Sequence, residues 1–286
     1  MRIEKICLIG YGYWGKILHR NLTNLGFVNV KILDEILDNM DELTGDFDYY
    51  FVVTPFTSHV DVLEKISKFR SKKVWCEKPL AESYQDVNRI YKKMSARDNM
   101  LFVDWVYLYN PAINFVKELS KDKKIKQVIL NRTNDGPVRT DCSSIWDLSS
   151  HDLSITFKIF GYRENFFNWN EFSLKTHEVS GSNISWTYRN GTQIIINSSW
   201  QHQTKNRVSV FITEDDDMII FDDIKKNVTY LKDGKAEVTS FSDCKSPLES
   251  ALEFFFSSED FSENKKMTEQ ITLEITSYNE LKQNSI

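Results

Sequence analysis

The stretch from Ile6 to Gly15, ICLIGYGYWG, decides the fold of the first part of the chain. A short apolar run leads directly into three glycines spaced as GxGxxG, and the residues after them have helical spacing. We therefore expect a buried strand, a tight turn and a helix in that order. In such a unit Gly10 permits the turn, Gly12 lets the backbone approach a pyrophosphate, and Gly15 lets the helix pack closely on the strand.

This turn has the properties of a dinucleotide-binding site. The helix after it would present free backbone N–H groups and a partial positive charge to phosphates, and Tyr13 and Trp14 lie within the turn. Asp34 ends the next predicted strand, where a carboxylate can bind a ribose 2′-hydroxyl and repel a 2′-phosphate. We expect NAD(H) as the preferred cofactor and NADP(H) as the alternative. The alternative is a structural glycine turn with an aspartate that caps the next segment.

Strands and helices alternate through the first third of the chain. This pattern predicts a parallel sheet that is covered on both faces and connected by right-handed crossovers. We place this α/β Rossmann domain at residues 1–108. The expected strands are 6–10, 28–33, 49–53, 73–76 and 100–106, and the expected helices are 13–25, 60–69 and 83–94.

The pattern changes after about residue 120, where short alternating segments predict a mostly antiparallel sheet with one open or partner-covered face. Asn190-Gly191 and Asp233-Gly234 are typical of hairpin turns. Helices are expected at 145–160 and 268–281, the second packing back on the first domain. We place this α+β substrate-binding and oligomerisation domain at 109–286. Its expected strands are 126–131, 172–179, 184–188, 193–200, 207–213, 218–221 and 228–231.

The composition excludes several classes of protein. The chain has 286 residues, 41% of them hydrophobic, and a net charge of −5 without a basic stripe, so nucleic acid is not an expected partner. We identify no signal peptide and no apolar run long enough to cross a membrane, and we expect a cytoplasmic protein with no membrane partner. The four cysteines are widely spaced, which argues against a disulfide framework and against a metal site.

Two motifs follow strands at the carboxyl edge of the predicted parallel sheet, where ligands bind in such folds. Thr54, Pro55 and His59 belong to TPFTSH, after the third strand, and Glu77 and Lys78 belong to EKP, after the fourth. A lysine at this edge can hydrogen-bond a substrate hydroxyl and hold positive charge beside a developing alkoxide. Taken alone, the first motif could be only a turn, and the second only a surface lysine before a proline.

A third motif, WDLSSHD, covers residues 146–152. Asp147 and His151 are four residues apart, so they share one face if the segment is helical. A carboxylate can orient an imidazole, and histidine exchanges a proton near neutral pH. The alternative is a histidine that a nearby acid satisfies within a helix. A metal is not expected here, because no third ligand stands at a recognisable spacing, and Asp152 is expected to be a structural acid.

Together these motifs resemble the Gfo/Idh/MocA oxidoreductases, a family that includes glucose-fructose oxidoreductase and inositol 2-dehydrogenase. The likeness rests on GYGYWG, Asp34, TPFTSH, EKPL and WDLSSHDLSI in this order. It extends over most of the chain. The segment YNPA at 109–112 resembles the family's crossing into the second domain, and residues 190–207 resemble the sheet of members from nucleotide-sugar and cell-surface sugar pathways.

The resemblance implies an NAD(P)-dependent sugar oxidoreductase that moves a hydride between nicotinamide and a sugar hydroxyl or keto carbon. It implies that Lys78 contacts the reacting oxygen and that Asp147 and His151 form the pocket pair, with His151 as general acid/base. Tyr109 and Arg207 are weaker pocket candidates. The implied substrate is a nucleotide-linked sugar or its keto form in unusual-sugar or surface-polysaccharide biosynthesis, and relatives are commonly homodimers or homotetramers.

The sequence also departs from the family pattern, which leaves the substrate open. Ser149 and Ser150 stand where relatives commonly have Gly or Ala and then Pro, and Phe56 stands where many have Asn. The segment from Asp34 to Asp48 is short, which predicts a reduced helix and a more open adenine side. Two other functions remain on the same scaffold: an NAD-dependent glycosidase, in which oxidation is transient, and a non-catalytic dinucleotide-binding protein.

Overall fold

The computed structural model of the chain divides into two compact units, each described here by itself. One unit comprises Met1–Asp104 with Leu252–Ile286, and the other comprises Trp105–Ala251. The sequence placed the boundary after residue 108 and assigned 109–286 to the second domain, with the helix at 268–281 packing back on the first; in the structure, all residues from Leu252 onward group with the first unit. The structure describes residues 3–34, 42–136, 139, 141–162, 168–172 and 180–283.

The first unit is built on a five-stranded parallel sheet with the order β2-β1-β3-β4-β5. The prediction of a parallel Rossmann sheet is therefore confirmed. Its strands are almost wholly apolar because helices cover both faces. The strands are β1 (Ile6–Ile9), β2 (Val30–Leu33), β3 (Tyr49–Val52), β4 (Lys73–Cys76) and β5 (Met100–Val103). The predicted reduced helix after Asp34 involves residues 35–41, which lie outside the described residues.

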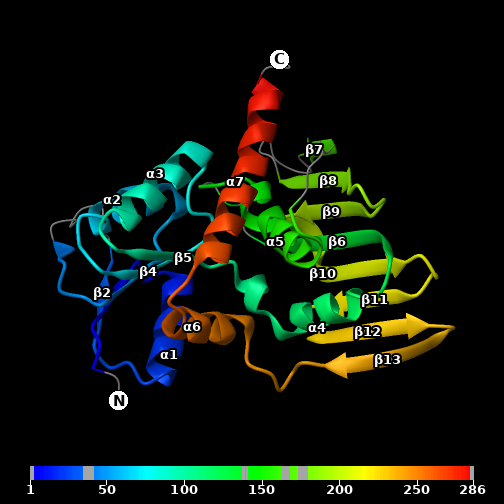
Figure 1. Cartoon of the computed structure of the whole chain (residues 1–286), viewed down its shortest axis with the longest axis horizontal. Coiled ribbons are helices and arrows are strands. Elements are labelled where there is room, and N and C mark those ends of the chain that lie inside the picture. Colours follow the sequence, from blue (N-terminus) through cyan, green and yellow to red (C-terminus); the bar gives the residue numbers. More distant parts are fainter. Residues whose placement is uncertain are drawn as a thin grey trace. The chain divides into compact units, whose positions relative to one another are not determined.

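Helices from both ends of the chain cover this sheet, and Figure 1 shows α1 and α6 on one side of it and α2 and α3 on the other. On the first side, Phe255 of α6 packs against the rings of Phe51, Trp75 and Phe102 from three neighbouring strands. The sequence missed α6, which continues the apolar core from the far end of the chain. The helices are α1 (Tyr13–Asn24), α2 (His59–Ile66), α3 (Tyr84–Ser95), α6 (Pro247–Ser257) and α7 (Ser262–Gln283).

Helix α7 is attached to the edge strand β5 by a side chain that acts as a strand partner. The amide of Asn264 accepts a hydrogen bond from the Val103 N–H at 2.8 Å and donates one to the Val103 carbonyl, also at 2.8 Å. Asn264 is 2% exposed. This pair of bonds satisfies the backbone at the end of β5 and fixes the start of the C-terminal helix, so that helix is part of the Rossmann unit.

The second unit carries an eight-stranded sheet with the order β13-β12-β11-β10-β6-β9-β8-β7. Among the strand pairs of the described residues, β6–β9 is the one parallel pair, so the prediction of a mostly antiparallel sheet is confirmed. The sequence missed the exposed strand β13, and of the strand expected at 172–179, residues 173–179 lie outside the described part. The strands are β6 (Ile125–Asp135), β7 (Asn168–Phe172), β8 (Gly181–Thr187), β9 (Gln193–Ser199), β10 (Gln201–Thr213), β11 (Met218–Asp222), β12 (Asn227–Lys232) and β13 (Lys235–Ser240).

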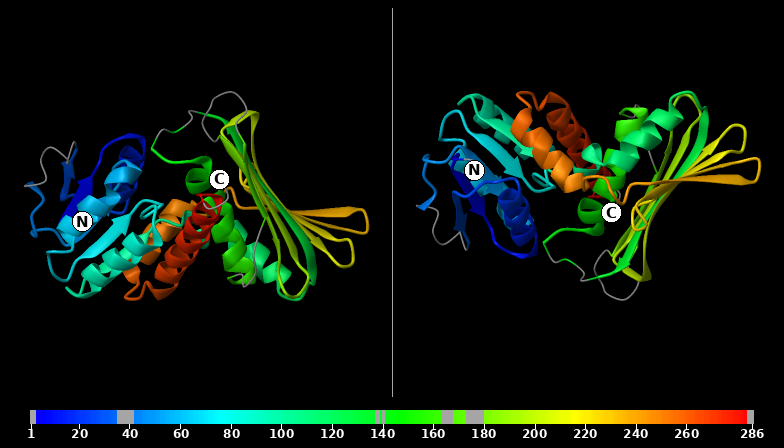
Figure 2. Two further views of the ribbon diagram at one scale, coloured as in Figure 1. Left: turned by 90° about the horizontal axis from the view of Figure 1, so that it is seen from above. Right: turned by 90° about the horizontal axis from the view of Figure 1, so that it is seen from below.

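Helices pack on one face of this sheet, as the two views of Figure 2 show. They are α4 (Pro111–Ser120), which the sequence missed, and α5 (Ser150–Phe160), which the sequence placed within 145–160. The residues 145–149 instead form a π-helical turn, η4 (Ile145–Ser149), and a 3-10 turn, η3 (Val106–Tyr109), precedes α4. Within the described ranges, no helix combines the length and the apolar character that crossing a membrane requires.

Candidate functional site

The three glycines of the first turn differ in the space around them. Gly10 has a φ of +93°, and a Cβ built there would lie 2.6 Å from the Val53 carbonyl oxygen. A Cβ at Gly15 would lie 2.3 Å from the Gly10 carbonyl oxygen. At Gly12, no described atom lies within 4 Å of such a Cβ. Since the surrounding backbone does not require a glycine at this position, the open space fits a group from outside the chain, such as a pyrophosphate.

The beginning of α1 suits an anion. The helix has no acidic residue in its first turn, and Tyr13, its first residue, is 82% exposed. The Asp34 carboxylate accepts a hydrogen bond from the Tyr11 N–H at 3.0 Å, which connects the glycine turn to the end of β2. Asp34 is exposed. The turn, the helix N-terminus and the acid at the end of β2 are therefore connected, and the free helix N-terminus suits an anionic group.

His59 joins the ends of two neighbouring strands. Its Nδ1 lies 2.9 Å from the Pro79 carbonyl oxygen and its Nε2 lies 3.0 Å from the Thr54 carbonyl oxygen. Because carbonyl oxygens only accept, both contacts are hydrogen bonds only when the ring carries two N–H groups. The side chain of this predicted cofactor residue is 1% exposed, and its bond to the Pro79 carbonyl supports the loop after Lys78.

Glu77 and Lys78 stand at the carboxyl end of β4, next to the glycine turn. The Trp14 indole N–H donates a hydrogen bond to Glu77 Oε1, and the Lys78–Pro79 peptide bond is cis. Burial raises the pKa of Glu77 to about 7, and the nearby Lys78 opposes this rise. Glu77 also hydrogen-bonds Asp104, a buried acid after β5 that the sequence did not single out.

In the second unit, Asp147 lies on the η4 turn and His151 lies on the first turn of α5. Asp147 Oδ2 accepts a hydrogen bond from the Trp200 indole N–H at 2.9 Å, and its Oδ1 lies 3.5 Å from Arg139 Nη1. The sequence expected Asp147 to orient His151 across one face of a regular helix. The π-helical turn changes that face, and the His151 ring packs edge-on against Tyr107, with ring centroids 5.3 Å apart.

A buried polar network lies behind His151. Arg132 donates to both carboxylate oxygens of Asp152, at 3.0 and 2.8 Å, and to the Tyr107 hydroxyl at 2.8 Å. The Tyr107 hydroxyl in turn donates to Asp223 at 2.7 Å, and Arg207 lies 3.6 Å from the same carboxylate. Burial raises the pKa of Tyr107 to about 12, so its hydroxyl stays protonated as a donor at neutral pH.

The sequence found only part of this network. Arg207 was a weak pocket candidate and belongs to it, whereas Tyr109, the other candidate, lies half-buried on η3. Arg132 and Tyr107 were missed. A signal existed for Arg132, because it continues the inward-facing series of β6 after Val128 and Leu130, where a charged side chain needs a buried partner.

Ser149, the first departure from the family pattern, ends the η4 turn inside a ring of three hydroxyls. Its Oγ lies 2.9 Å from Ser182 Oγ and 2.7 Å from Ser198 Oγ, and those two lie 2.9 Å apart. All three side chains are buried. Each hydroxyl can donate once and accept once, so the ring fixes the turn that carries Asp147 on strands β8 and β9.

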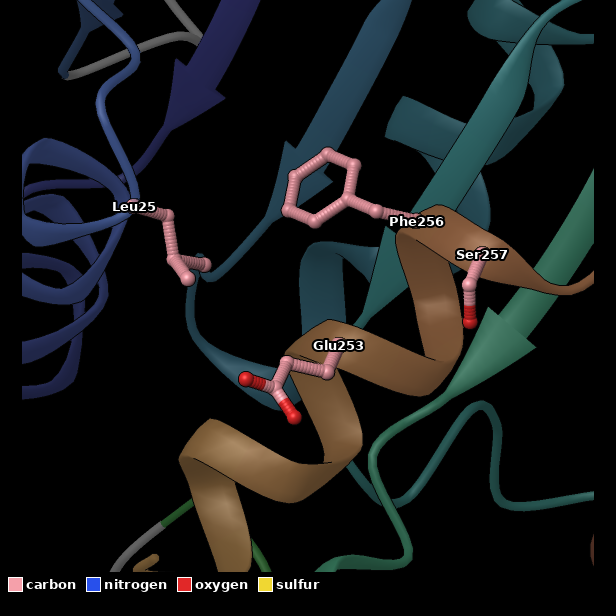
Figure 3. A pocket seen from close by; sticks show the side chains of 4 residues that line it. All are labelled: Leu25, Glu253, Phe256 and Ser257. Carbon is pink, nitrogen blue, oxygen red and sulfur yellow. The ribbon is translucent and has the colours of Figure 1, made fainter.

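A pocket of the first unit is lined by none of the candidate site residues. It has a volume of about 370 Å³ and is lined by Leu25, Glu253, Phe256 and Ser257 (Figure 3). It lies at the end of α1, hence at the amino edge of the sheet, opposite the glycine turn.

Among the described residues, no three His, Cys, Asp or Glu side chains come together to hold a metal ion.

The sequence of the Rossmann unit matches a known family. Residues 16–105 match the model of the oxidoreductase family with an NAD-binding Rossmann fold, Gfo/Idh/MocA. This match covers the Rossmann unit and is with the oxidoreductase family that the sequence motifs indicated. No curated protein was found whose sequence matches this one.

Solved structures extend the likeness of fold to the whole chain. The chain is similar to UDP-N-acetylglucosamine 3-dehydrogenase from Acidithiobacillus ferrooxidans, with a TM-score of 0.82 and 16% identity over 97% of each chain. A dehydrogenase from Clostridium difficile gives a TM-score of 0.81 with 13% identity over 100% of each chain. A 3-ketoreductase from Actinomadura kijaniata, in complex with TDP-benzene and NADP, gives 0.75 with 13% identity over 96% of each chain.

Proposed function

We propose that the protein is an NAD-dependent sugar oxidoreductase that moves a hydride between nicotinamide and a hydroxyl or keto carbon of a nucleotide-linked sugar. The observation that carries the proposal is the carboxyl edge of the Rossmann sheet. There the glycine turn, with its open position at Gly12, stands beside Asp34 and Lys78. Two proteins of similar fold, a UDP-N-acetylglucosamine 3-dehydrogenase and a 3-ketoreductase in complex with TDP-benzene, support the substrate class.

Each residue of the proposed site has one task. A bound nicotinamide supplies the carbon that accepts or gives the hydride. The Lys78 ammonium donates a hydrogen bond to the reacting sugar oxygen and stabilises negative charge on it. His151 takes the proton of the hydroxyl during oxidation and returns it during reduction. Asp147, whose carboxylate accepts a hydrogen bond from the Trp200 indole N–H, supplies a negative charge in the same part of the second unit as His151.

The experiment is a screen of nucleotide-linked sugars, their keto forms and free polyols, with NADH absorbance as the readout. We expect turnover in this panel and its loss, by a factor of about 10² to 10⁴, in Lys78→Ala and His151→Ala. Lys68→Ala, at an exposed lysine after α2, is the matched control and keeps wild-type activity. Full activity in both site variants would overturn the assignment.

Two outcomes of the screen favour the other functions of this scaffold. Cleavage of a glycosidic bond without net formation of NADH indicates a glycosidase in which oxidation is transient. Bound dinucleotide without turnover on any member of the panel indicates a binding protein. Product analysis by mass spectrometry, run beside the absorbance assay, separates these outcomes.

The preference for NAD over NADP rests on Asp34. Its carboxylate is exposed at the end of β2 and is fixed by the Tyr11 N–H, so a 2′-phosphate would meet a held negative charge. We expect kcat/KM for NADH to exceed that for NADPH, and Asp34→Ser to lower this ratio by at least tenfold. A ratio unchanged in Asp34→Ser would contradict the role of the carboxylate.

Self-association through the open face of the second sheet completes the proposal. Ile195, Ile129, Val210 and Ile220 are directly paired across β9, β6, β10 and β11, and each is only partly buried. Such a β-branched row suits contact with a second copy of the chain. Val210→Lys should shift the sedimentation coefficient to that of a monomer, whereas Thr239→Lys on the exposed strand β13 should not. A wild-type monomer would refute self-association.

A further inference from the structure

Two acids meet at the carboxyl edge of the Rossmann sheet. Cys76 at the end of β4 pairs with Val103 at the end of β5, so the residues that follow them, Glu77 and Asp104, stand side by side. Their carboxyl groups are hydrogen-bonded to one another. Asp104 is 2% exposed, and the proposed reaction assigns it no task.

The contact requires a proton. Two ionised carboxylates only accept hydrogen bonds and repel each other, so an oxygen-to-oxygen bond between them needs one group in its neutral form. Asp104 Oδ1 is buried and has no hydrogen-bond partner among the described residues. An unbonded oxygen is far less costly to bury in a neutral acid than in a carboxylate, which places the proton on Asp104.

The other groups around the pair agree with this assignment. Glu77 accepts from Trp14 as well as from Asp104, and Lys78 supplies the adjacent positive charge, so Glu77 is the better site for the negative charge. Burial raises the pKa of Asp104 well above its ordinary value, with the charge on Glu77 adding to the rise. The Cys76 thiol, whose pKa is also raised by burial, stays neutral.

We propose that Asp104 is a positioning residue for Lys78, acting as a neutral acid that donates to Glu77 and fixes Glu77 as the ionised member of the pair beside the lysine. The inference rests on the proposed function, in which Lys78 contacts the reacting oxygen. Removal of the proton from the pair would place a second negative charge beside Lys78, which draws the ammonium toward the acids and away from a developing alkoxide.

The protonation of Asp104 can be tested without any substrate. Infrared difference spectra between wild type and Asp104→Asn, recorded at pH 8 with carboxyl-labelled aspartate, should show the carbonyl stretch of one protonated aspartic acid in the wild type only. A carboxylate band in its place would overturn the proposal. This readout is independent of the proposed reaction, so it stands even if Lys78→Ala leaves activity unchanged and the site assignment fails.

The positioning role is tested by a pair of variants. Asp104→Asn keeps an N–H donor for Glu77, so it should retain kcat within about threefold. Because it cannot ionise, a decrease of kcat at alkaline pH that comes from deprotonation of the pair should be absent in this variant. Asp104→Leu has no donor and should lower kcat at least tenfold with a smaller change in KM. In ¹⁵N-tryptophan spectra, with Trp14→Phe for assignment, the Trp14 indole signal should move in Asp104→Leu and stay in Asp104→Asn. Equal effects of both variants on kcat and on the indole signal would overturn the role.

Discussion

Replacing Asp152 with Asn removes one charge from the buried ion pair of the second unit. Arg132 Nε and Nη2 donate to the two Asp152 oxygens at 3.0 and 2.8 Å, and the two side chains are 4% and 2% exposed. In the variant one of these donors faces an amide N–H, and the guanidinium keeps only neutral partners, the amide oxygen of the new Asn and the Tyr107 hydroxyl. The variant therefore leaves a buried positive charge without its counter-charge.

The size of the effect follows from this geometry. Breaking a buried pair by removing one partner costs about 3–5 kcal/mol. For a unit the size of residues 105–251, each kcal/mol lowers the midpoint of thermal unfolding by about 2–4 °C. We expect a fall of roughly 6–20 °C in the transition of this unit. The double variant Arg132→Met/Asp152→Leu should regain most of the loss, because similar apolar side chains often replace a buried pair at little cost.

Calorimetry together with urea unfolding measures this effect in the whole chain. The matched control is Lys124→Ala, which breaks the 2.7 Å pair between Lys124 and Glu214, whose side chains are 68% and 57% exposed. That variant should cost less than about 1 kcal/mol. A loss in Asp152→Asn no larger than that of the control would refute the reasoning, and so would a double variant as unstable as the single one.

Three further predictions follow from particular contacts. Gly12→Ala should leave the unfolding midpoint unchanged and weaken dinucleotide binding in calorimetric titrations, whereas Gly10→Ala should lower the midpoint itself, because its Cβ would collide with the Val53 carbonyl. Ser149→Ala should cost about 1–2 kcal/mol in urea unfolding, because the hydroxyl ring loses two bonds; no loss would show that the ring is not needed. Burial raises the pKa of Glu77 to about 7 in the folded chain, so the folded chain binds this proton more tightly than the unfolded chain does. The resulting gain in the free energy of unfolding is present at acidic pH and is lost as pH rises through 7. The Rossmann unit should therefore be more stable at pH 5.5 than at pH 8, by about 2 kcal/mol for the roughly 1.5 pH units between 5.5 and this pKa at 1.36 kcal/mol per unit, and Glu77→Gln should flatten this dependence.

Sequence patterns predicted the structure well where a single short segment determines the element. The glycine spacing predicted the turn after β1, and alternating segments predicted most strands of the second sheet within a few residues. Helix α6 was missed, although its phenylalanines pack on strands far away in the chain. Strand β13 was missed because it is exposed along its length and its alternation rests on only two apolar residues, Ala236 and Val238.

The sequence by itself determined the parallel Rossmann sheet, the glycine turn and the family likeness of the Rossmann unit, because each of these depends on residues that are neighbours in the chain. Only the tertiary structure decided which side chains share a proton or a charge. Trp14, Glu77 and Asp104 are hydrogen-bonded because the segments after β1, β4 and β5 all begin at the carboxyl edge of one sheet. Arg132 of strand β6 binds Asp152 of helix α5, 20 residues further along the chain. Hydrogen bonds and ion pairs act over a few ångströms in space, and no spacing along the sequence encodes those distances.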